Sequence, residues 1–257
     1  MGNKAFFIII TGKQTMGLLA GVCFCLGLTI AMLPLYVSVE APNYDLGRYT
    51  IVIDPGHGGR DPGAVGSRGL LEKEMVLDIG LRLRDRFTAA RAHVIMTRTS
   101  DGDLAPPDAP FRQRADLLHR AALANDSEAH IYLSIHGNSA PDPQWSGAQT
   151  FYYSEGDRSL ATMIQRELVR QLGPNHRQAR WAPFRVLRDT QMPAALVEVG
   201  FLSNPKEEGM LADALYRERI AAAIFDGTVL FLINYFPREE GDRPVEGGSF
   251  PGDPNLY

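Results

Sequence analysis

Residues 49–64 read YTIVIDPGHGGRDPGA, a short β-branched run that ends in a glycine-rich turn. Such a run, bounded by Pro and Gly, is typical of a buried strand. His57 follows the run directly, at the edge where open α/β sheets usually place their ligand-binding loops. This segment therefore predicts a strand of an α/β sheet with a candidate site residue at its carboxyl end.

Similar short runs alternate along the chain with stretches of helical spacing, and this alternation predicts an α/β domain. Four stretches are expected to be helices: residues 71–87, 110–124, 158–171 and 213–235. Six runs are expected to be strands: residues 49–54, 93–97, 130–135, 148–153, 184–187 and 195–199. They predict a single central, mostly parallel six-stranded sheet flanked by helices.

The N-terminal part predicts one transmembrane helix. Residues 16–37 carry no charged side chain, and this run is long enough to cross a bilayer core of about 30 Å as a helix. Lysines precede the run and acidic residues follow it, which favours a cytoplasmic N-terminus and an extracytoplasmic remainder. A cleaved signal peptide is the alternative, but the run is long for one and no clear small-x-small site follows it. We expect residues 1–40 to anchor the protein in the membrane and residues 41–48 to form a linker.

Length and composition allow one folded domain of ordinary size, because 45% of the 257 residues are hydrophobic. The net charge of -4 comes from interspersed acidic and basic residues and gives no electrostatic footprint for nucleic acid. We expect the folded, catalytic domain at residues 49–236. Residues 237–257 are rich in Pro, Gly and charge, and we expect a disordered tail there.

Four polar residues stand at the ends of apolar runs. His136 follows the run IYLSI and precedes a glycine, as His57 does, so the two imidazoles can converge from two strand ends. Glu72 begins an expected helix, where the helix dipole also favours an acid, and Glu74 has nearly the same claim. Glu198 interrupts the run AALVEVGF, where an unpaired charge is costly, so a functional acid is the simpler interpretation.

These residue types together predict a metallohydrolase. Two imidazoles and a carboxylate are a standard ligand set for a catalytic zinc ion that keeps one position open for water. A second carboxylate can then move the protons. The other histidines are expected to be ordinary surface or capping residues: His93, His119, His130 and His176. Three further residues could position a substrate or brace loops: Arg98, Arg114 and Asn138.

Four motifs carry a specific resemblance. In order along the chain, DPGHGGRDPGA, EKEM, SIHGNSA and EVGFLSNPKE resemble the zinc-dependent N-acetylmuramoyl-L-alanine amidases of the amidase 3 family, over about residues 49–235. The resemblance implies that Zn2+ is bound by His57, Glu72 and His136. It also implies that Glu198 is the catalytic acid/base for cleaving the bond between N-acetylmuramic acid and L-alanine in peptidoglycan. Gly137 replaces the Ala or other small apolar residue that is common there, a change expected to matter little.

Within that family, the segments DGDLAP at residues 101–106 and WSGAQTFYY at residues 145–153 resemble amidases of spore-forming bacteria that act on cortex peptidoglycan. This implies a role in cortex maturation, through muramic-δ-lactam formation, and in germination. The expected partners are a muramic acid deacetylase or an activating lipoprotein, and the expected place is the cell envelope or the forespore intermembrane space. Three alternatives stay open: a vegetative cell-wall amidase, a zinc carboxypeptidase or deacetylase, and a non-catalytic peptidoglycan-binding scaffold.

Overall fold

The computed structural model describes residues 44–236. The predicted membrane anchor at residues 1–40 and the predicted tail at residues 237–257 lie outside this range, as do residues 41–43 of the predicted linker. None of the helices within residues 44–236 is both long and apolar enough to span a bilayer.

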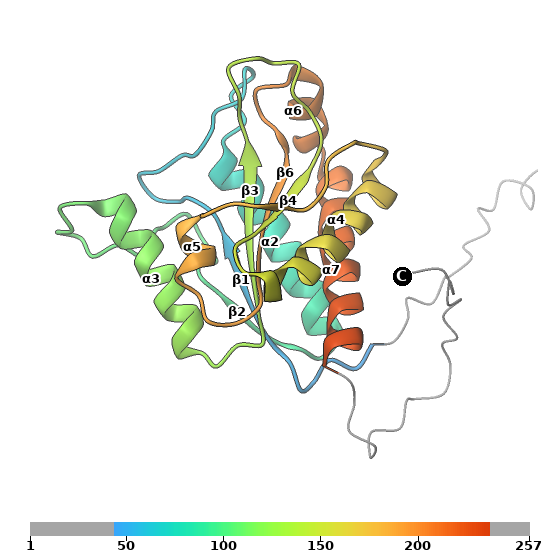
Figure 1. Ribbon diagram of the computed structural model, residues 1–257. Helices are drawn as coiled ribbons and strands as arrows, with labels where there is room; N and C mark the ends of the chain where they lie inside the picture. The colour runs from blue at the N-terminus through green and yellow to red at the C-terminus, as the bar shows by residue number, and fades with distance from the viewer. Residues whose placement is uncertain (1–43, 237–257) are drawn as a thin grey trace, which may run out of the picture. The chain divides into compact units, whose positions relative to one another are not determined.

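A six-stranded, mostly parallel sheet forms the centre of the domain (Figure 1), as predicted. Its spatial order is β2-β1-β3-β6-β4-β5, and β1, β2, β3 and β6 run parallel. β4 runs antiparallel to β6 and parallel to β5. The strands are β1 Thr50–Pro55, β2 His93–Met96, β3 Ile131–Asn138, β4 Gln149–Tyr152, β5 Arg180–Trp181 and β6 Ala194–Phe201.

Helices cover both faces of the sheet, with α2, α4 and α7 on one face and α3 and α5 on the other (Figure 1). The four predicted long helices are present with small shifts of their ends, and two short helices were not predicted. The helices are α2 Glu72–Ala89, α3 Arg112–Asp126, α4 Arg158–Leu172, α5 Arg185–Arg188, α6 Pro205–Leu211 and α7 Ala214–Tyr235, with one 3-10 turn, η1 Glu155–Asp157.

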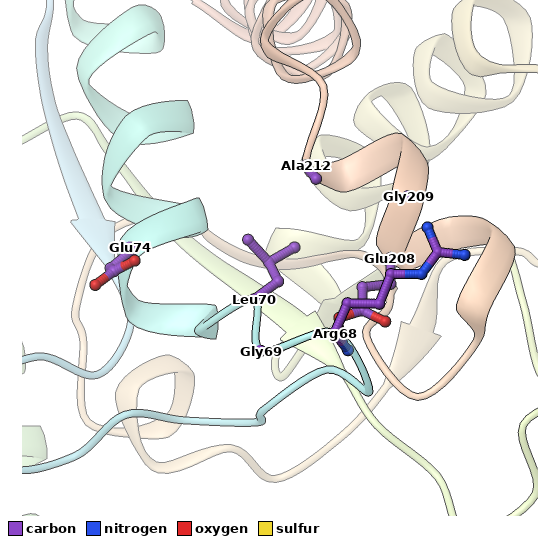
Figure 2. A pocket seen from close by; sticks show the side chains of 7 residues that line it. All are labelled: Arg68, Gly69, Leu70, Glu74, Glu208, Gly209 and Ala212. Atoms are coloured by element: carbon purple, nitrogen blue, oxygen red, sulfur yellow. Dashed lines mark hydrogen bonds between the residues drawn. The ribbon is translucent and has the colours of Figure 1, made fainter.

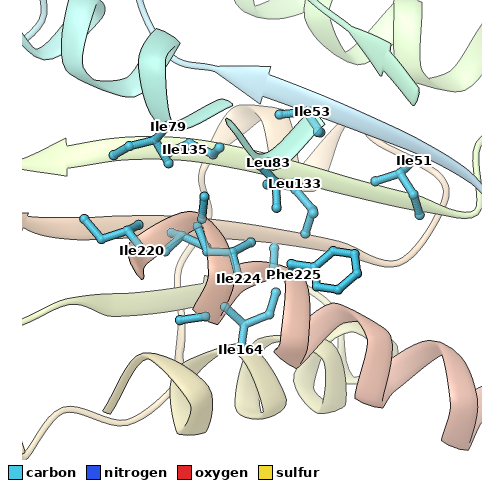
Figure 3. Close-up of a cluster of buried hydrophobic side chains, with 14 of the residues drawn as sticks. Ile51, Ile53, Ile79, Leu83, Leu133, Ile135, Ile164, Ile220, Ile224 and Phe225 are labelled. Atoms are coloured by element: carbon cyan, nitrogen blue, oxygen red, sulfur yellow. The ribbon is translucent and has the colours of Figure 1, made fainter. Parts of the chain in front are cut away.

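Alternate side chains of the central strands enter two hydrophobic cores. Ile51 and Leu133 point towards α2, α4 and α7, where they meet side chains such as Ile224 (Figure 3). Val52 and Tyr132 point to the opposite face, towards α3 and α5. Because both faces are covered, the central strands are apolar at nearly every position, and this is why they stand out in the sequence.

The strand predicted at residues 184–187 is wrong. This segment is the helix α5, and the sixth strand is the two-residue β5 just before it. A short apolar run does not distinguish a strand from a buried helical turn by periodicity. Here Val186 and Leu187 pack into the core on the α3 face, and one helical turn brings both side chains onto that core.

Candidate metal centre and acid/base site

The candidate site lies at the carboxyl ends of three adjacent parallel strands. β1 ends at Pro55 and is followed by His57, while His136 of β3 stands in register with Glu198 of β6. Glu72 is the first residue of α2, which returns to this edge from the loop that follows His57. Parallel strands present their carboxyl ends at one edge, so residues far apart in the sequence converge there.

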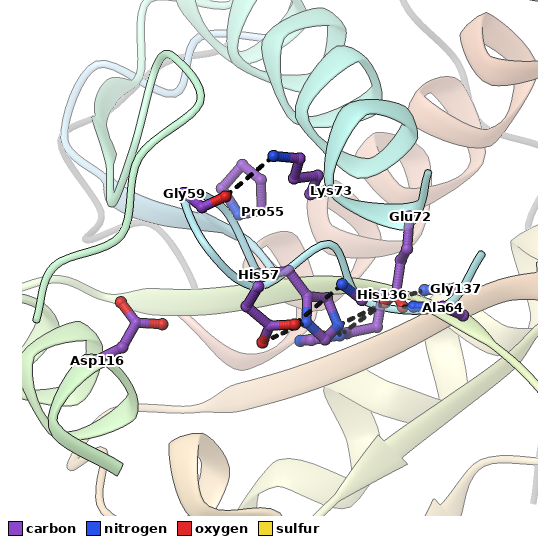
Figure 4. A network of polar contacts seen from close by, with 12 residues as sticks. Pro55, His57, Gly59, Ala64, Glu72, Lys73, Asp116, His136 and Gly137 are labelled. Carbon is purple, nitrogen blue, oxygen red and sulfur yellow. Dashed lines mark hydrogen bonds and ion pairs between the residues drawn. The ribbon is translucent and has the colours of Figure 1, made fainter. Parts of the chain in front are cut away.

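Three side chains form a compact group (Figure 4). The Oε1 atom of Glu72 lies 2.9 Å from Nε2 of His57 and 3.1 Å from Nδ1 of His136. The two imidazole nitrogens are 3.2 Å apart. One ligand atom from each residue lies within 4.8 Å of the others, and the group is the one in residues 44–236 that could hold a metal ion. The structure therefore brings together the three predicted ligands.

Glu72 is fixed by two backbone amides. Its Oε2 accepts a hydrogen bond of 2.8 Å from the amide of Ala64, and its Oε1 accepts one of 2.9 Å from the amide of Gly137. Burial raises the pKa of Glu72, but the hydrogen bonds and charges of His136 and His57 outweigh it and lower the pKa well below its usual range. The side chain is therefore an ionised, oriented carboxylate.

His57 is oriented by a second carboxylate. Its Nδ1 lies 2.9 Å from Oδ2 of Asp61, which leaves Nε2 to face Glu72. Burial lowers the pKa of His57, but the hydrogen bonds and charges of Glu72 and Asp61 outweigh it and raise the pKa to about 9. A carboxylate behind a ligating histidine is the usual second partner of a metal-bound imidazole.

The backbone at His57 has an unusual conformation. Its φ of 60° lies in the left-handed region, which a non-glycine residue seldom occupies, and the next residue, Gly58, has φ of 121°. Gly56 also has no room for a side chain, because an added Cβ would lie 2.2 Å from the ring of His136. The glycines predicted to allow a sharp turn therefore let the two histidines approach each other.

Two buried arginines hold this turn through its carbonyl groups. Arg98 donates to the carbonyl of Pro55 at 2.9 Å and to that of Gly56 at 2.8 Å. Arg120 donates to the carbonyl of Pro55 at 2.8 Å and to that of His57 at 2.6 Å. Three residues were predicted to position a substrate or brace loops. Arg98 braces a loop, whereas Arg114 is exposed on α3, and Asn138 ends β3, where its carbonyl accepts a hydrogen bond of 2.8 Å from the amide of Leu202. Arg120 was missed.

Arg120 is held by a buried acid at the end of β1. Its Nη1 lies 2.6 Å from Oδ1 of Asp54, and both side chains are 1% exposed. Asp54 also accepts hydrogen bonds from Thr97, Tyr132 and Ser134. Burial raises the pKa of Asp54, but the charge of Arg120 and the hydrogen bonds from Tyr132, Thr97 and Arg120 lower it to about 2. The signal that could have found this pair is Asp54 itself, a charged residue at the end of a buried strand.

The segment DGDLAP packs on the same turn. Asp101 accepts a hydrogen bond of 2.8 Å from the amide of Gly59 and forms an ion pair of 2.7 Å with Lys73. Lys73 also donates a hydrogen bond to the carbonyl of Gly59. This segment thus supports the loop that carries His57 and contributes no atom to the ligand group.

Glu198 stands next to the ligand group and has a different environment. Its Oε2 is buried without a hydrogen-bond partner in the described part of the chain. Burial and the charge of Glu72 raise its pKa, and the nearby His136 and His57 lower it, with the balance at about 7. A carboxyl group with a pKa near neutrality can both accept and donate a proton, which is the property of a general acid/base.

The comparisons with known proteins identify the family. The sequence profile of the N-acetylmuramoyl-L-alanine amidases matches residues 51–229. The chain belongs to this family. The predicted family and enzyme class are thereby confirmed.

Three relatives show the extent of the similarity. The amidase is 44% identical over 200 residues to the germination-specific N-acetylmuramoyl-L-alanine amidase of Bacillus subtilis, covering 76% of this chain and 82% of that protein. It is 36% identical to the amidase LytC of the same organism, covering 71% of this chain and 35% of LytC. The CwlD amidase of Clostridioides difficile, solved in complex with the GerS lipoprotein, has a TM-score of 0.69 and 35% identity, covering 72% of this chain and 98% of that chain.

Glu74, which the residue pattern by itself did not separate from Glu72, lies elsewhere in the amidase. Its side chain is exposed and lines a surface hollow beside Arg68, Leu70 and Glu208 (Figure 2), whereas Glu72 is 3% exposed. Two positions along a helix put the side chains about 200° apart around its axis, so the two acids face opposite directions. Only Glu72 joins the ligand group.

Proposed function

We propose that the amidase uses a zinc ion to hydrolyse the amide bond between N-acetylmuramic acid and L-alanine in peptidoglycan. In this proposal His57, Glu72 and His136 bind the metal and Glu198 is the general acid/base. The observation that supports it best is the convergence of three ligand atoms within 4.8 Å beside a carboxyl group whose buried oxygen has no partner in residues 44–236.

The donor atoms fit zinc. Two imidazole nitrogens and one carboxylate oxygen are a common ligand set of catalytic zinc sites, which keep another position for water or substrate. The oxygen of Glu72 lies 2.9 Å from Nε2 of His57 and 3.1 Å from Nδ1 of His136, so all three donor atoms face one another. When bound, zinc supplies Lewis acidity, which polarises a carbonyl group and acidifies water. Asp61 would keep His57 oriented towards it.

Glu198 has the geometry for moving protons between the water and the leaving group. Its register with His136 places it one strand away from a ligand, which is about 4.8 Å across the sheet. As a carboxylate, Glu198 takes a proton from the attacking water. As a carboxylic acid, it then gives that proton to the nitrogen of L-alanine as the amide bond breaks. A pKa of about 7 suits both steps near neutral pH.

We further propose that the substrate is spore cortex, in muramic-δ-lactam formation and germination. The similarity to a germination-specific amidase supports this, as do the segments at residues 101–106 and 145–153. The complex of the similar CwlD with a lipoprotein supports an activating lipoprotein as partner, with a muramic acid deacetylase as the other candidate. The enzyme would act outside the cytoplasm, anchored through residues 16–37. A vegetative cell wall is the alternative substrate.

The test is digestion of purified vegetative and cortex peptidoglycan by the full-length protein, with zinc and after chelation, followed by mass spectrometry of the fragments. We expect zinc-dependent release of stem peptides with a free L-alanine N-terminus. Release from cortex alone would support the cortex assignment, and equal release from both would favour the vegetative alternative. No release by protein with zinc bound, with or without an added lipoprotein of the GerS type, would contradict the proposed activity.

A further inference from the structure

Arg177 lies at the far end of a row of polar side chains that starts at the ligand group. His136 of β3, Glu198 of β6 and Gln149 of β4 occupy paired positions on neighbouring strands. Paired positions carry their side chains on the same face of a sheet. The Oε1 atom of Gln149 accepts a hydrogen bond of 3.0 Å from Nη1 of Arg177, so the guanidinium extends the row beyond Glu198.

Several contacts hold Arg177 in place. Its amide donates to Oδ1 of Asn175 at 2.9 Å, and its carbonyl accepts from Nε2 of Gln165 at 3.2 Å. Its Nε donates to the carbonyl of Ser146 at 2.8 Å. Both the backbone and the base of the guanidinium are thus fixed, so the side chain is preorganised at this edge of the sheet.

The charge of Arg177 is stacked but not neutralised. Its Cζ lies 4.8 Å from the ring centroid of Phe201 and 5.8 Å from that of Trp145, which is 53% exposed. Aromatic faces stabilise a guanidinium but leave its charge in place. Within residues 44–236, no carboxylate forms an ion pair with Arg177 and its Nη2 has no hydrogen-bond partner. Arg120, in contrast, is paired with two acids.

A stem peptide carries a group that would complement this charge. In peptidoglycan, L-alanine is followed by a D-glutamate that is linked through its side chain, so its α-carboxyl group is either free or amidated. By standard backbone dimensions this group lies about 6 Å from the scissile nitrogen. Adjacent strands are about 4.8 Å apart, so a peptide that runs from Glu198 towards β4 would bring this carboxyl group to Gln149 and Arg177.

We propose that Arg177 is a specificity-determining residue that binds a free carboxylate of the stem peptide on the alanine side of the scissile bond. The inference rests on the proposed amidase function and specifies which stems the site prefers. A guanidinium with a free Nη2 suits a carboxylate better than an amide, because both of the carboxylate oxygens accept hydrogen bonds and carry charge. Stems with a free carboxylate should therefore be cleaved in preference to amidated stems.

The experiment compares two pairs of N-acetylmuramoyl tripeptides with the zinc-loaded, full-length enzyme. One pair differs only in whether the α-carboxyl of D-glutamate is free or amidated, and the other only in the carboxyl group of the third residue. We expect the wild type to prefer the free acid in one pair by about 10- to 100-fold in kcat/KM, mostly through KM. The pair that shows the preference identifies the carboxylate.

Two variants test the residue. Arg177→Gln should lose most of the preference, because kcat/KM falls mainly on the free-acid substrate of the pair. Arg166→Gln removes the same charge from an exposed position on α4, on the other face of the sheet, and should keep the wild-type preference. An unchanged preference in Arg177→Gln would overturn the proposal. An equal loss of kcat/KM on all four substrates would also overturn it, because that result indicates a structural role.

A binding measurement distinguishes a failure of this inference from a failure of the amidase proposal. If the wild type cleaves none of the four substrates, with or without an added lipoprotein of the GerS type, the proposed function fails, and calorimetric titration of the free tripeptides then tests Arg177 alone. Tighter binding of the free acid by the wild type than by Arg177→Gln would support the carboxylate site. Equal affinity for acid and amide would overturn it.

Discussion

Glu198 occupies a strand position whose neighbours, Val197 and Val199, are almost completely buried. We expect Glu198→Gln to keep zinc, because the ligand group is untouched, and to lose turnover by on the order of 10²- to 10⁴-fold, the usual effect of removing a general acid/base. The measurement is kcat on soluble muropeptides together with zinc per protein. Wild-type turnover in a variant with full zinc occupancy would contradict the assigned role.

Glu72 and Glu74 form a matched pair for the ligand assignment, since both are acids in the first turn of α2. Glu72→Gln should lose at least about tenfold in zinc affinity, because a charged donor is replaced by a neutral amide in a buried site. Glu74→Gln should bind zinc like the wild type, because Glu74 faces the separate surface hollow. Competition with a chromophoric chelator measures both affinities, and equal losses would show that the assignment is wrong.

At the scale of the element, the loop after β1 depends on α3 through Arg120. Arg120→Ala leaves Asp54 as an unpaired buried charge, and we expect a loss of about 3–5 kcal/mol in the free energy of unfolding. Zinc affinity should fall as well, because the carbonyl of His57 loses its partner. Arg114→Ala, on the exposed side of the same helix, should change neither quantity. Urea denaturation of metal-free protein measures the stability. A loss in the free energy of unfolding below about 1 kcal/mol for Arg120→Ala would contradict the structural role assigned to this buried ion pair.

Gly227 lets α7 pack closely against α4. An added Cβ at this position would lie 2.5 Å from Cα of Ile164 and 2.9 Å from the carbonyl of Met163, and backbone atoms cannot move aside as a side chain does. Gly227→Ala should therefore destabilise the domain by about 1–3 kcal/mol, although alanine is the better helix former.

The control for Gly227 is Gly209, which lies in α6. There an added Cβ would come no closer than 3.4 Å to the end of the Arg68 side chain. Gly209→Ala should be neutral or stabilise by up to about 1 kcal/mol through helix propensity. Thermal and urea unfolding of both variants measure the difference, and similar effects of the two substitutions would rule out the packing explanation.

At the scale of the whole molecule, two site groups link stability to pH. The folded pKa of Glu198 is raised from 4.5 to about 7 and that of His57 from 6.5 to about 9. Each group contributes stability that is complete below its unfolded pKa and is lost as the pH rises through its folded pKa. The metal-free protein should therefore become less stable between about pH 5 and pH 9, by on the order of 5 kcal/mol.

Zinc should reverse this trend, because it binds His57 only after the imidazole has lost its proton. The gain in Tm on adding zinc should be larger at pH 8 than at pH 6. Calorimetric unfolding at a fixed free zinc concentration measures it. A gain that stayed constant or fell with pH would show that His57 does not exchange a proton for the metal.

The sequence alone was sufficient for features that depend on local pattern or on residue type. The central strands are buried on both faces, so they are apolar at nearly every position, and the long helices show the spacing of one apolar face. His57, His136 and Glu198 could be selected because each is a polar residue at the end of, or within, such a run, whereas Glu72 was selected over Glu74 through the resemblance of EKEM to the family motif. Their order in four motifs was enough to name the family, which the comparisons confirm.

The tertiary structure decided what depends on contacts between distant segments. α5 and the two-residue β5 are too short to show a period, and only packing on the α3 face selects a helix at Val186 and Leu187. The choice of Glu72 over Glu74 depends on which way the first turn of α2 faces. The contact of Arg120 with the carbonyl of His57 and that of Arg177 with Gln149 join residues from different elements, and no local pattern contains such a pairing. Local chemistry thus determined which residues could form the site, and long-range packing determined which of them meet.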